Sequence, residues 1–263
     1  MPSENQGSET LSGARIVVTR AENDQKGLIS QLEKLGATVF SIPSISRRPL
    51  LLEPDLINLL SQIQKCDWVI FTSPFAVQVL ENNSFPLAKA CEKTKVAAVG
   101  PSTEKALEQN GVIVDCIPVP HTWHHFAEYM GNLKGSSICL PRSQKGAVEF
   151  PEMLRSLGAT VFETWTYNTV PNCPDYTSWI PLKEKIDYIL FTSGTTVKGF
   201  QNGLEAHGLQ NTIANTNLTC IGPSTASACM DLFGRADLIA QPHTEGGLIN
   251  ALINHINLEN YHE

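Results

Sequence analysis

Apolar runs of strand length alternate along the chain with segments whose apolar residues recur at helical spacing. Residues 68–71 and 188–191 are unbroken apolar runs, and each is followed by Thr-Ser and then by a helical pattern. A strand buried on both faces gives such a run, and small polar residues directly after it are typical of a helix N-terminus. Because this alternation continues to the C-terminus, the pattern predicts an α/β fold with parallel sheets and right-handed crossovers.

The same landmarks occur twice in the same order, 120 to 122 residues apart. They are an Asp followed by an apolar strand and Thr-Ser, the run Leu-Gly-Ala-Thr-Val-Phe, and the run Gly-Pro-Ser-Thr. The paired segments are 67–77 and 187–197, 35–40 and 157–162, and 100–103 and 222–225. Landmarks repeated in one order at nearly one spacing indicate an internal duplication that covers most of the chain.

Two polar, proline-containing stretches, 43–49 and 170–174, interrupt the alternation and are typical of linkers. Neither lies at the boundary between the repeats near residue 136. If the chain crosses between two lobes at both stretches, each lobe contains five strands in a complete doubly wound sheet, and the crossings form a two-stranded hinge. The predicted parts are residues 14–44 with 174–263 as one lobe, 49–169 as the other, and linkers at 45–48 and 170–173.

Composition supports two globular domains, since 263 residues with 42% hydrophobic content can bury two cores. No apolar run reaches membrane-spanning length, and residues 1–13 are polar and acidic, which predicts a disordered tail. Seven scattered cysteines without a Cys-x-x-Cys pair favour reduced thiols in a cytoplasmic compartment over disulfides or a zinc site. A net charge of −7 without a basic stripe argues against a nucleic-acid partner.

Polar and cationic residues follow several predicted strands, where an open α/β sheet binds its ligands. With two crossings, residues of both lobes can face one another across a cleft. They are Arg20, Ser193 and Ser224 of one lobe and Ser73, Ser102 and Arg142 of the other.

An ordered set of short motifs resembles the uroporphyrinogen-III synthase family over nearly the whole chain after the tail. The motifs are Val17-Val18-Thr19-Arg20, Phe71-Thr72-Ser73, Val99-Gly100-Pro101-Ser102-Thr103, Thr166-Tyr167-Asn168-Thr169, Phe191-Thr192-Ser193-Gly194 and Ile221-Gly222-Pro223-Ser224-Thr225. The resemblance implies two flavodoxin-like or Rossmann-like lobes joined by a two-stranded hinge. The chain departs from the family pattern after Arg142, where Ser143 stands in place of a frequent Gly.

This resemblance implies a lyase without a cofactor that acts in tetrapyrrole (heme, chlorophyll or cobalamin) biosynthesis. Its substrate is the linear tetrapyrrole hydroxymethylbilane, which loses water and closes with inversion of the terminal pyrrole to give uroporphyrinogen III. Because the cation-like intermediate and the pyrrole nucleophile both belong to the substrate, the protein positions the chain and assists the leaving hydroxide. Tyr167 aligns with the tyrosine given this role in the family, and packing between the lobes is the alternative role for it.

The implied substrate is a polycarboxylate, which a protein of net charge −7 repels at long range, so recognition must be local. Backbone N–H groups at helix N-termini can bind carboxylates without net positive charge. Helix capping is the competing role for the Ser and Thr residues, and a solvated surface charge is the competing role for the cations. The substrate-binding candidates are Arg20, Ser73, Ser102, Thr103, Arg142, Lys145, Ser193, Gly194, Ser224 and Thr225.

Other candidate chemistry is weaker. His121 and His243 repeat within Pro-His-Thr, and His124 and His125 add a His-rich patch, but the pattern indicates polar turns and no metal site. No glycine motif for a dinucleotide or a P-loop is present. We expect a cytoplasmic monomer without nucleic-acid or membrane partners, in transient contact with the preceding pathway enzyme. The alternative is a non-catalytic two-lobed module that binds or senses an anionic small ligand.

Overall fold

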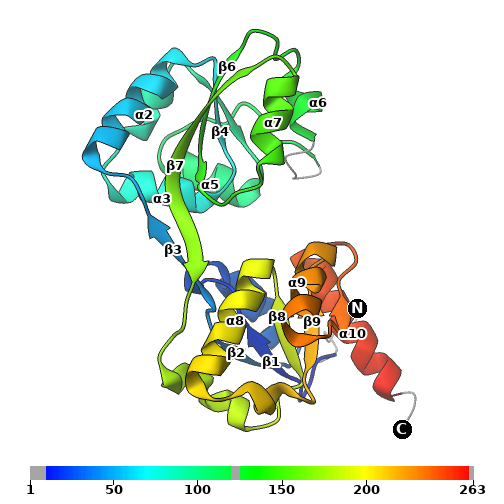
Figure 1. Cartoon of the computed structure of the whole chain (residues 1–263). Helices are drawn as coiled ribbons and strands as arrows, with labels where there is room; N and C mark the ends of the chain where they lie inside the picture. The colour runs from blue at the N-terminus through cyan, green and yellow to red at the C-terminus, as the bar shows by residue number, and fades with distance from the viewer. Residues whose placement is uncertain (1–9, 120–124, 261–263) are drawn as a thin grey trace, which may run out of the picture. The chain divides into compact units, whose positions relative to one another are not determined.

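The computed structural model describes residues 10–119 and 125–260 and divides the chain into two compact units (Figure 1). Unit 1 contains the chain up to Ser46 and again from Val170 onward, and unit 2 contains Arg47–Thr169. Each unit contains a five-stranded sheet. These sheets confirm the predicted α/β class.

The sheet of unit 1 buries apolar side chains on both faces, as the unbroken apolar runs predict. Its order is β10 (Leu238–Ile239), β9 (Asn217–Cys220), β8 (Tyr188–Phe191), β1 (Arg15–Val18) and β2 (Thr38–Ser41), with parallel pairing throughout. Val17 of β1 lies in a cluster with helices α8 (Gly194–His207) and α9 (Pro223–Phe233). Ile16 and Val18 lie in a second cluster with α1 (Lys26–Lys34) and α10 (Glu245–Asn260). Successive side chains of a strand alternate between faces, so one short run supplies both clusters.

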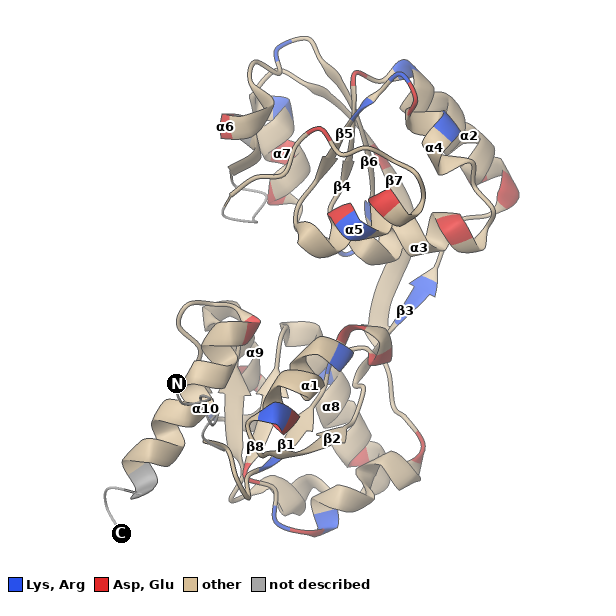
Figure 2. Cartoon of the chain, turned by 180° about the vertical axis from the view of Figure 1, so that it is seen from behind, with Lys and Arg blue, Asp and Glu red and all other residues tan. Residues whose placement is uncertain are grey.

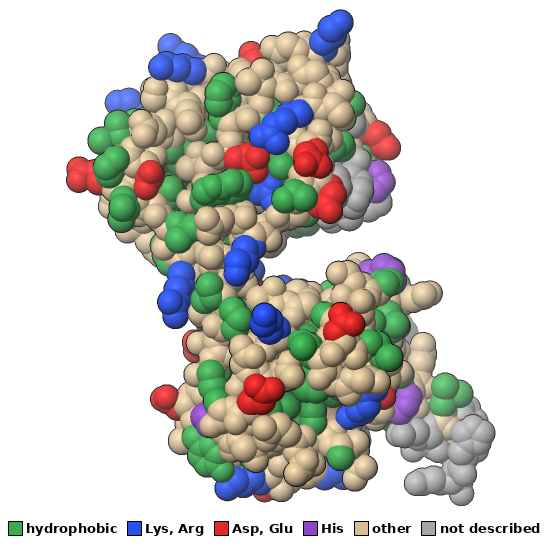
Figure 3. Space-filling view, viewed as in Figure 1, with side chains coloured by type: hydrophobic (Ala, Val, Ile, Leu, Met, Phe, Trp, Pro, Cys, Tyr) green, Lys and Arg blue, Asp and Glu red, His purple; other side chains and the backbone are tan. Residues whose placement is uncertain are grey.

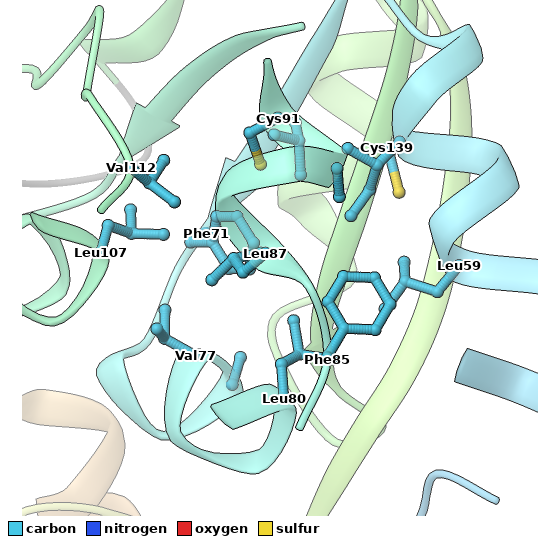
Figure 4. Close-up of a cluster of buried hydrophobic side chains, with 14 of the residues drawn as sticks. Leu59, Phe71, Val77, Leu80, Phe85, Leu87, Cys91, Leu107, Val112 and Cys139 are labelled. Atoms are coloured by element: carbon cyan, nitrogen blue, oxygen red, sulfur yellow. The ribbon is translucent and has the colours of Figure 1, made fainter. Parts of the chain in front are cut away.

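Unit 2 is built in the same way. Its sheet order is β3 (Ile45–Pro49), β7 (Thr160–Pro171), β6 (Ser137–Ser143), β4 (Trp68–Phe71) and β5 (Lys95–Ala98). One face is covered by α2 (Glu53–Lys65), α3 (Pro74–Asn82), α4 (Leu87–Cys91) and α5 (Pro101–Gln109), and the other by α6 (Phe126–Met130) and α7 (Glu149–Ser156). In Figure 4 the side chains of Leu59, Phe71 and Leu80 point into the first of these clusters from α2, β4 and α3.

The two sheets contain equivalent strands of the duplicated sequence. In unit 1, β1 and β2 come from the first repeat and β8 and β9 from the second, whereas in unit 2 β4 and β5 come from the first and β6 and β7 from the second. The orders β9-β8-β1-β2 and β5-β4-β6-β7 therefore correspond strand by strand. Each repeat contributes to both units, as the positions of the two crossings predict.

Three predicted segments differ from the structure. Residues 112–117, expected to form a strand, contribute only the isolated bridge between Ala97 and Cys116. The fifth strand of unit 2 is instead β3, which lies within the stretch expected to be a linker, beside β7. At the N-terminus, Leu11 is fully buried and its N–H donates to the carbonyl oxygen of Leu35 at 2.8 Å, so residues 10–13 belong to the folded part; the rest of the predicted tail lies outside the described residues.

Four aspartates, two in each repeat, bind backbone N–H groups at the beginnings of strands. In each case one Oδ2 atom accepts a hydrogen bond from a backbone N–H at the beginning of a neighbouring strand, at 2.7 or 2.8 Å. The pairs are Asp67 with Ser137, Asp187 with Arg15, Asp115 with Val96, and Asp237 with Leu218. An unpaired N–H at a strand end costs free energy if buried, and these carboxylates satisfy it. The repeated Asp is therefore a structural feature of the duplication.

Charged residues of both signs are interspersed along the ribbon in Figure 2, and their side chains are interspersed on the face seen in Figure 3. Strand β3 is coloured as basic in Figure 2 because it carries Arg47 and Arg48. Within residues 10–119 and 125–260, no helix is long and apolar enough to cross a membrane.

Candidate functional site

The predicted site residues of unit 1 all follow the carboxyl ends of β1, β8 and β9, which are adjacent strands. Arg20 lies two residues after β1, Ser193 is the N-cap of α8, and Gly222 is the N-cap of α9. Parallel pairing therefore brings one cation and two helix N-termini to a single edge of the sheet. This edge is where the strand order of an open α/β sheet predicts ligand binding.

Ser193 caps its helix. Its Oγ accepts a hydrogen bond from the Thr196 N–H, and Thr196 Oγ1 accepts one from the Ser193 N–H, both at 3.2 Å. Gly194 begins α8, and a Cβ at this position would lie 3.2 Å from the Cβ of Ala228 on α9, so glycine allows the two helices to approach closely. Capping, the competing role for Ser193, is thus present, and it leaves other N–H groups of the first turn for a ligand.

The two candidate substrate-binding residues of α9, Ser224 and Thr225, differ in their exposure to solvent. Ser224 is exposed in the first turn, whereas Thr225 is buried with 5% of its surface exposed. The hydroxyl of Ser224 can therefore meet a ligand directly. Thr225 contributes to the packing of the helix against the core.

Arg20 forms an ion pair with Glu245, the first residue of α10. The side chains of Arg20 and Glu245 are 22% and 39% exposed. A carboxylate of the protein therefore already lies beside this guanidinium.

In unit 2 the predicted residues follow the carboxyl ends of β6, β4 and β5, which are again adjacent. Ser73 is the N-cap of α3, and its Oγ accepts a hydrogen bond from the Phe75 N–H at 3.1 Å. Gly100 is the N-cap of α5, with Ser102 exposed and Thr103 buried in the first turn. The two sheets therefore present the same arrangement of helix N-termini, as the duplication leads us to expect.

Arg142 and Lys145 lie at the end of β6 and in the loop after it. Lys145 is exposed, whereas the Arg142 side chain is only 5% exposed and is held by Glu163 and by the carbonyl oxygen of Ala147. Burial lowers the pKa of the Arg142 guanidinium, and the Glu163 carboxylate opposes that change. In this structure Lys145 is thus open to a ligand, while the Arg142 guanidinium is buried and bound to Glu163 and Ala147 inside unit 2.

Tyr167 lies on β7 opposite Ser143, beside a bulge where the register between β6 and β7 shifts after Arg142. It is 6% exposed, and its ring packs edge-on against Phe75 with the ring centroids 5.0 Å apart. These contacts are within unit 2 and place the ring at the carboxyl edge of the sheet. Bulges are frequent next to functional sites because they redirect a side chain.

Arg47 and Phe75 also lie beside Tyr167, although neither is among the predicted site residues. The Arg47 guanidinium carbon lies 5.3 Å from the ring centroid of Phe75 and 5.7 Å from that of Tyr167, within the range of cation–π attraction. Arg47 was assigned to a linker because of its polar, proline-flanked surroundings. Only the position of β3 beside β7 shows that a cation lies next to Tyr167, and no local pattern could have shown it.

Of the four histidines noted in the sequence, His125 is the N-cap of α6 and His243 lies in the turn before α10. The Nδ1 atom of His243 lies 2.8 Å from the carbonyl oxygen of Ala240, in the turn before α10. His121 and His124 lie outside the described residues. Among the residues that the structure does describe, no three His, Cys, Asp or Glu side chains come together as a metal site.

Comparisons with known proteins converge on one family. The family model described as uroporphyrinogen-III synthase HemD matches residues 26–250. The chain is 28% identical to a uroporphyrinogen-III synthase of Synechococcus elongatus over 93% of this chain and 96% of that protein, and 26% identical to one of Chlorobaculum parvum over 86% and 92%.

Solved structures show the same fold. A uroporphyrinogen-III synthetase from Helicobacter pylori matches with a TM-score of 0.65 and 18% identity, over 92% of this chain and 99% of that one. A mutant uroporphyrinogen III synthase from Thermus thermophilus matches with a TM-score of 0.55 and 16% identity, over 94% and 100%. The predicted fold and the predicted relatives are thus the ones that the comparisons find.

Proposed function

Because this chain belongs to the uroporphyrinogen-III synthase family, it is a hydro-lyase of that family, and we propose how its residues act on hydroxymethylbilane. The match of the family model over residues 26–250 carries this conclusion. The swapped arrangement of the repeats in two five-stranded sheets agrees with it. The reaction removes the terminal hydroxyl of the linear tetrapyrrole as water and closes the ring with inversion of the last pyrrole.

Tyr167 is the proposed general acid. A phenol hydroxyl can donate a proton to the departing oxygen, which turns a poor leaving group into water. Phe75 and Arg47 support the ring of Tyr167 on its edge and face, so the hydroxyl is presented by a side chain of restricted mobility. Restricting the donor in this way lowers the entropic cost of reaching the reacting geometry.

The carboxylates of the substrate are proposed to bind at the helix N-termini of α3, α5, α8 and α9. These termini carry unsatisfied N–H groups and the positive end of the helix dipole, and they need no excess of basic residues. Arg20 and Lys145 add charged hydrogen bonds, and Arg47 lies where a carboxylate near Tyr167 could reach it. The proposed set does not include Arg142, because its guanidinium is buried and engaged.

Further properties remain predictions from the family. They are a cytoplasmic location, a monomeric state and transient contact with the enzyme that forms the bilane. Six of the seven cysteines are buried and all seven are free, which suits a reducing compartment. Light scattering of the purified protein, alone and with the preceding enzyme, tests the other two properties.

The experiment that tests the function supplies hydroxymethylbilane and separates the uroporphyrinogen isomers. We expect isomer III from the protein and isomer I from a buffer control, since closure without inversion is the uncatalysed outcome. A binding module without activity would retain the tetrapyrrole yet give isomer I only. That result would refute the enzymatic function.

A further inference from the structure

Arg142 connects two parts of unit 2. Its Nη1 atom lies 3.3 Å from Oε2 of Glu163, on β7, and its Nη2 atom donates to the carbonyl oxygen of Ala147 at 2.7 Å, in the loop after β6. Glu163 also accepts from Arg155 at 2.8 Å. Burying a guanidinium is costly unless it is paired, and these partners accept hydrogen bonds from two of its nitrogens.

The loop after β6 is folded closely over this guanidinium. A Cβ on Gly146 would lie 2.4 Å from Nη2 and 3.2 Å from Cζ of Arg142, so the contact requires glycine at this position. The Gly146 N–H donates to the carbonyl oxygen of Ser143 at 3.1 Å, which closes the turn. The side chain of Arg142 and the path of the loop therefore depend on each other.

The same loop holds the backbone of Tyr167. The Gln144 N–H donates to the carbonyl oxygen of Tyr167 at 2.9 Å, and the hydroxyl of Thr166 donates to the carbonyl oxygen of Arg142 at 3.2 Å. These two bonds span the register shift between β6 and β7. The direction in which Tyr167 leaves the strand is thus set by the bulge and by the loop that Arg142 braces.

We propose that Arg142 is a positioning residue that orients Tyr167 by bracing the loop after β6 against β7, and that it does not bind the substrate. This inference rests on the proposed role of Tyr167 as general acid. If the contacts of Arg142 with Glu163 and Ala147 are lost, we therefore expect the rate of the chemical step to fall and the affinity for the substrate to stay nearly unchanged. A residue that held a substrate carboxylate would instead raise KM.

Gly146→Ala tests the proposal without altering Arg142 or Tyr167, because the added methyl group displaces the guanidinium. We expect kcat to fall about tenfold and KM to change less than twofold. The melting temperature should fall as well, because the displaced guanidinium loses its contacts with Glu163 and Ala147 while it stays largely buried. Gly27→Ala is the matched control, since a Cβ there meets nothing within 4 Å. Arg142→Lys retains a charge for Glu163 but cannot bridge to Ala147 in the same planar geometry, and we expect it to lower kcat in the same way.

A double-mutant cycle separates positioning of Tyr167 from a general loss of structure. In the Tyr167→Phe background, Gly146→Ala should change kcat less than twofold, because the group that the brace orients is already absent. An equal fall of kcat in both backgrounds would overturn the proposal, as would a raised KM with unchanged kcat.

Different results would refute the role of Arg142, the role of Tyr167 and the enzymatic function. If Tyr167→Phe is slow and Gly146→Ala is as fast as the unaltered protein, Arg142 is not a positioning residue, and Tyr167 keeps its proposed role. If Tyr167→Phe is as fast as the unaltered protein, the general-acid role and the proposal for Arg142 are both refuted. If only isomer I forms, the proposed function itself is refuted.

Discussion

Arg20 and Glu245 form an ion pair at the carboxyl edge of the sheet of unit 1. Glu245 is the first residue of α10, where the helix dipole favours a negative charge. The pair therefore places a protein carboxylate beside the cation to which we propose that a substrate carboxylate binds. The Glu245 carboxylate and a substrate carboxylate would then compete for Arg20, and this competition would affect KM.

Removing the charge of Glu245 should strengthen substrate binding. We expect Glu245→Gln to lower KM and Arg20→Gln to raise it, each by about two- to fivefold, the range of a partly exposed ion pair. Initial rates over a series of hydroxymethylbilane concentrations measure both. The control is Glu184→Gln, which removes the ion pair between Glu184, before β8, and Arg15, at the start of β1. Both residues lie at the amino ends of their strands, away from the edge at which Arg20 lies. Equal KM values in all three variants would exclude Arg20 from the binding set.

Tyr167→Phe should lower kcat by about 10²- to 10⁴-fold with little change in KM, because general acid catalysis contributes on that scale and the ring itself is retained. The measurement is the rate of formation of isomer III at saturating substrate. Phe75→Leu removes the edge contact with Tyr167 but leaves its hydroxyl, and we expect a smaller decrease. An unaltered rate in Tyr167→Phe would make Tyr167 a packing residue.

Two helical glycines should respond oppositely to alanine. A Cβ on Gly199 of α8 would lie 1.9 Å from the carbonyl oxygen of Ser44, so Gly199→Ala should destabilise the protein by about 1–3 kcal/mol, as overpacking does. Gly27→Ala, in the open part of α1, should stabilise it by about 0.5–1 kcal/mol. Denaturant titration measures both. A Gly199→Ala variant as stable as the unaltered protein would show that α8 does not pack so closely on Ser44.

Asp67 should make unfolding depend on pH in the acidic range. Hydrogen bonds from the backbone N–H and hydroxyl of Ser137 lower the pKa of Asp67 below its ordinary value of 3.8. A lowered folded-state pKa contributes stability that is present above the unfolded value and is lost as the pH falls through the folded value. Ser137→Ala should therefore lose less stability than the unaltered protein between about pH 5 and pH 2. Urea unfolding at a series of pH values checks this, and parallel curves would contradict it.

Cys173 should be the thiol that reacts first with a maleimide under native conditions. It is the exposed cysteine of the seven, whereas burial raises the pKa of Cys91 to about 12 and also raises that of Cys139. Burial raises the pKa of Cys173 as well, so its labelling should accelerate with pH in the alkaline range. Mass spectrometry should find one label per chain and none in Cys173→Ser. Labelling of several cysteines at equal rates would show that the cores open readily.

The α/β class, the duplication and the helix N-termini followed from local patterns. Burial on both faces produces an apolar run, a cap requires a small polar residue at one position, and glycine ends a helix, so each of these features is encoded within a few residues. Ser73 and Ser193 act as N-caps where the pattern after each strand predicted a helix to begin. The chain passes from unit 1 to unit 2 after Ser46 and returns after Thr169, next to stretches in which proline and polar residues interrupt the apolar pattern.

Tertiary structure alone decided which side chains of the site are free and which are engaged. Arg142 is close to Glu163 only because β6 and β7 pair, and Arg47 reaches Tyr167 only because β3 lies beside β7. Sequence by itself determined the elements and the edge of each sheet at which the predicted site residues lie, since periodicity and capping are local. It could not determine contacts between residues distant in the chain. These contacts depend on strand order, on register and on one bulge, and the local pattern of apolar and polar residues encodes none of the three.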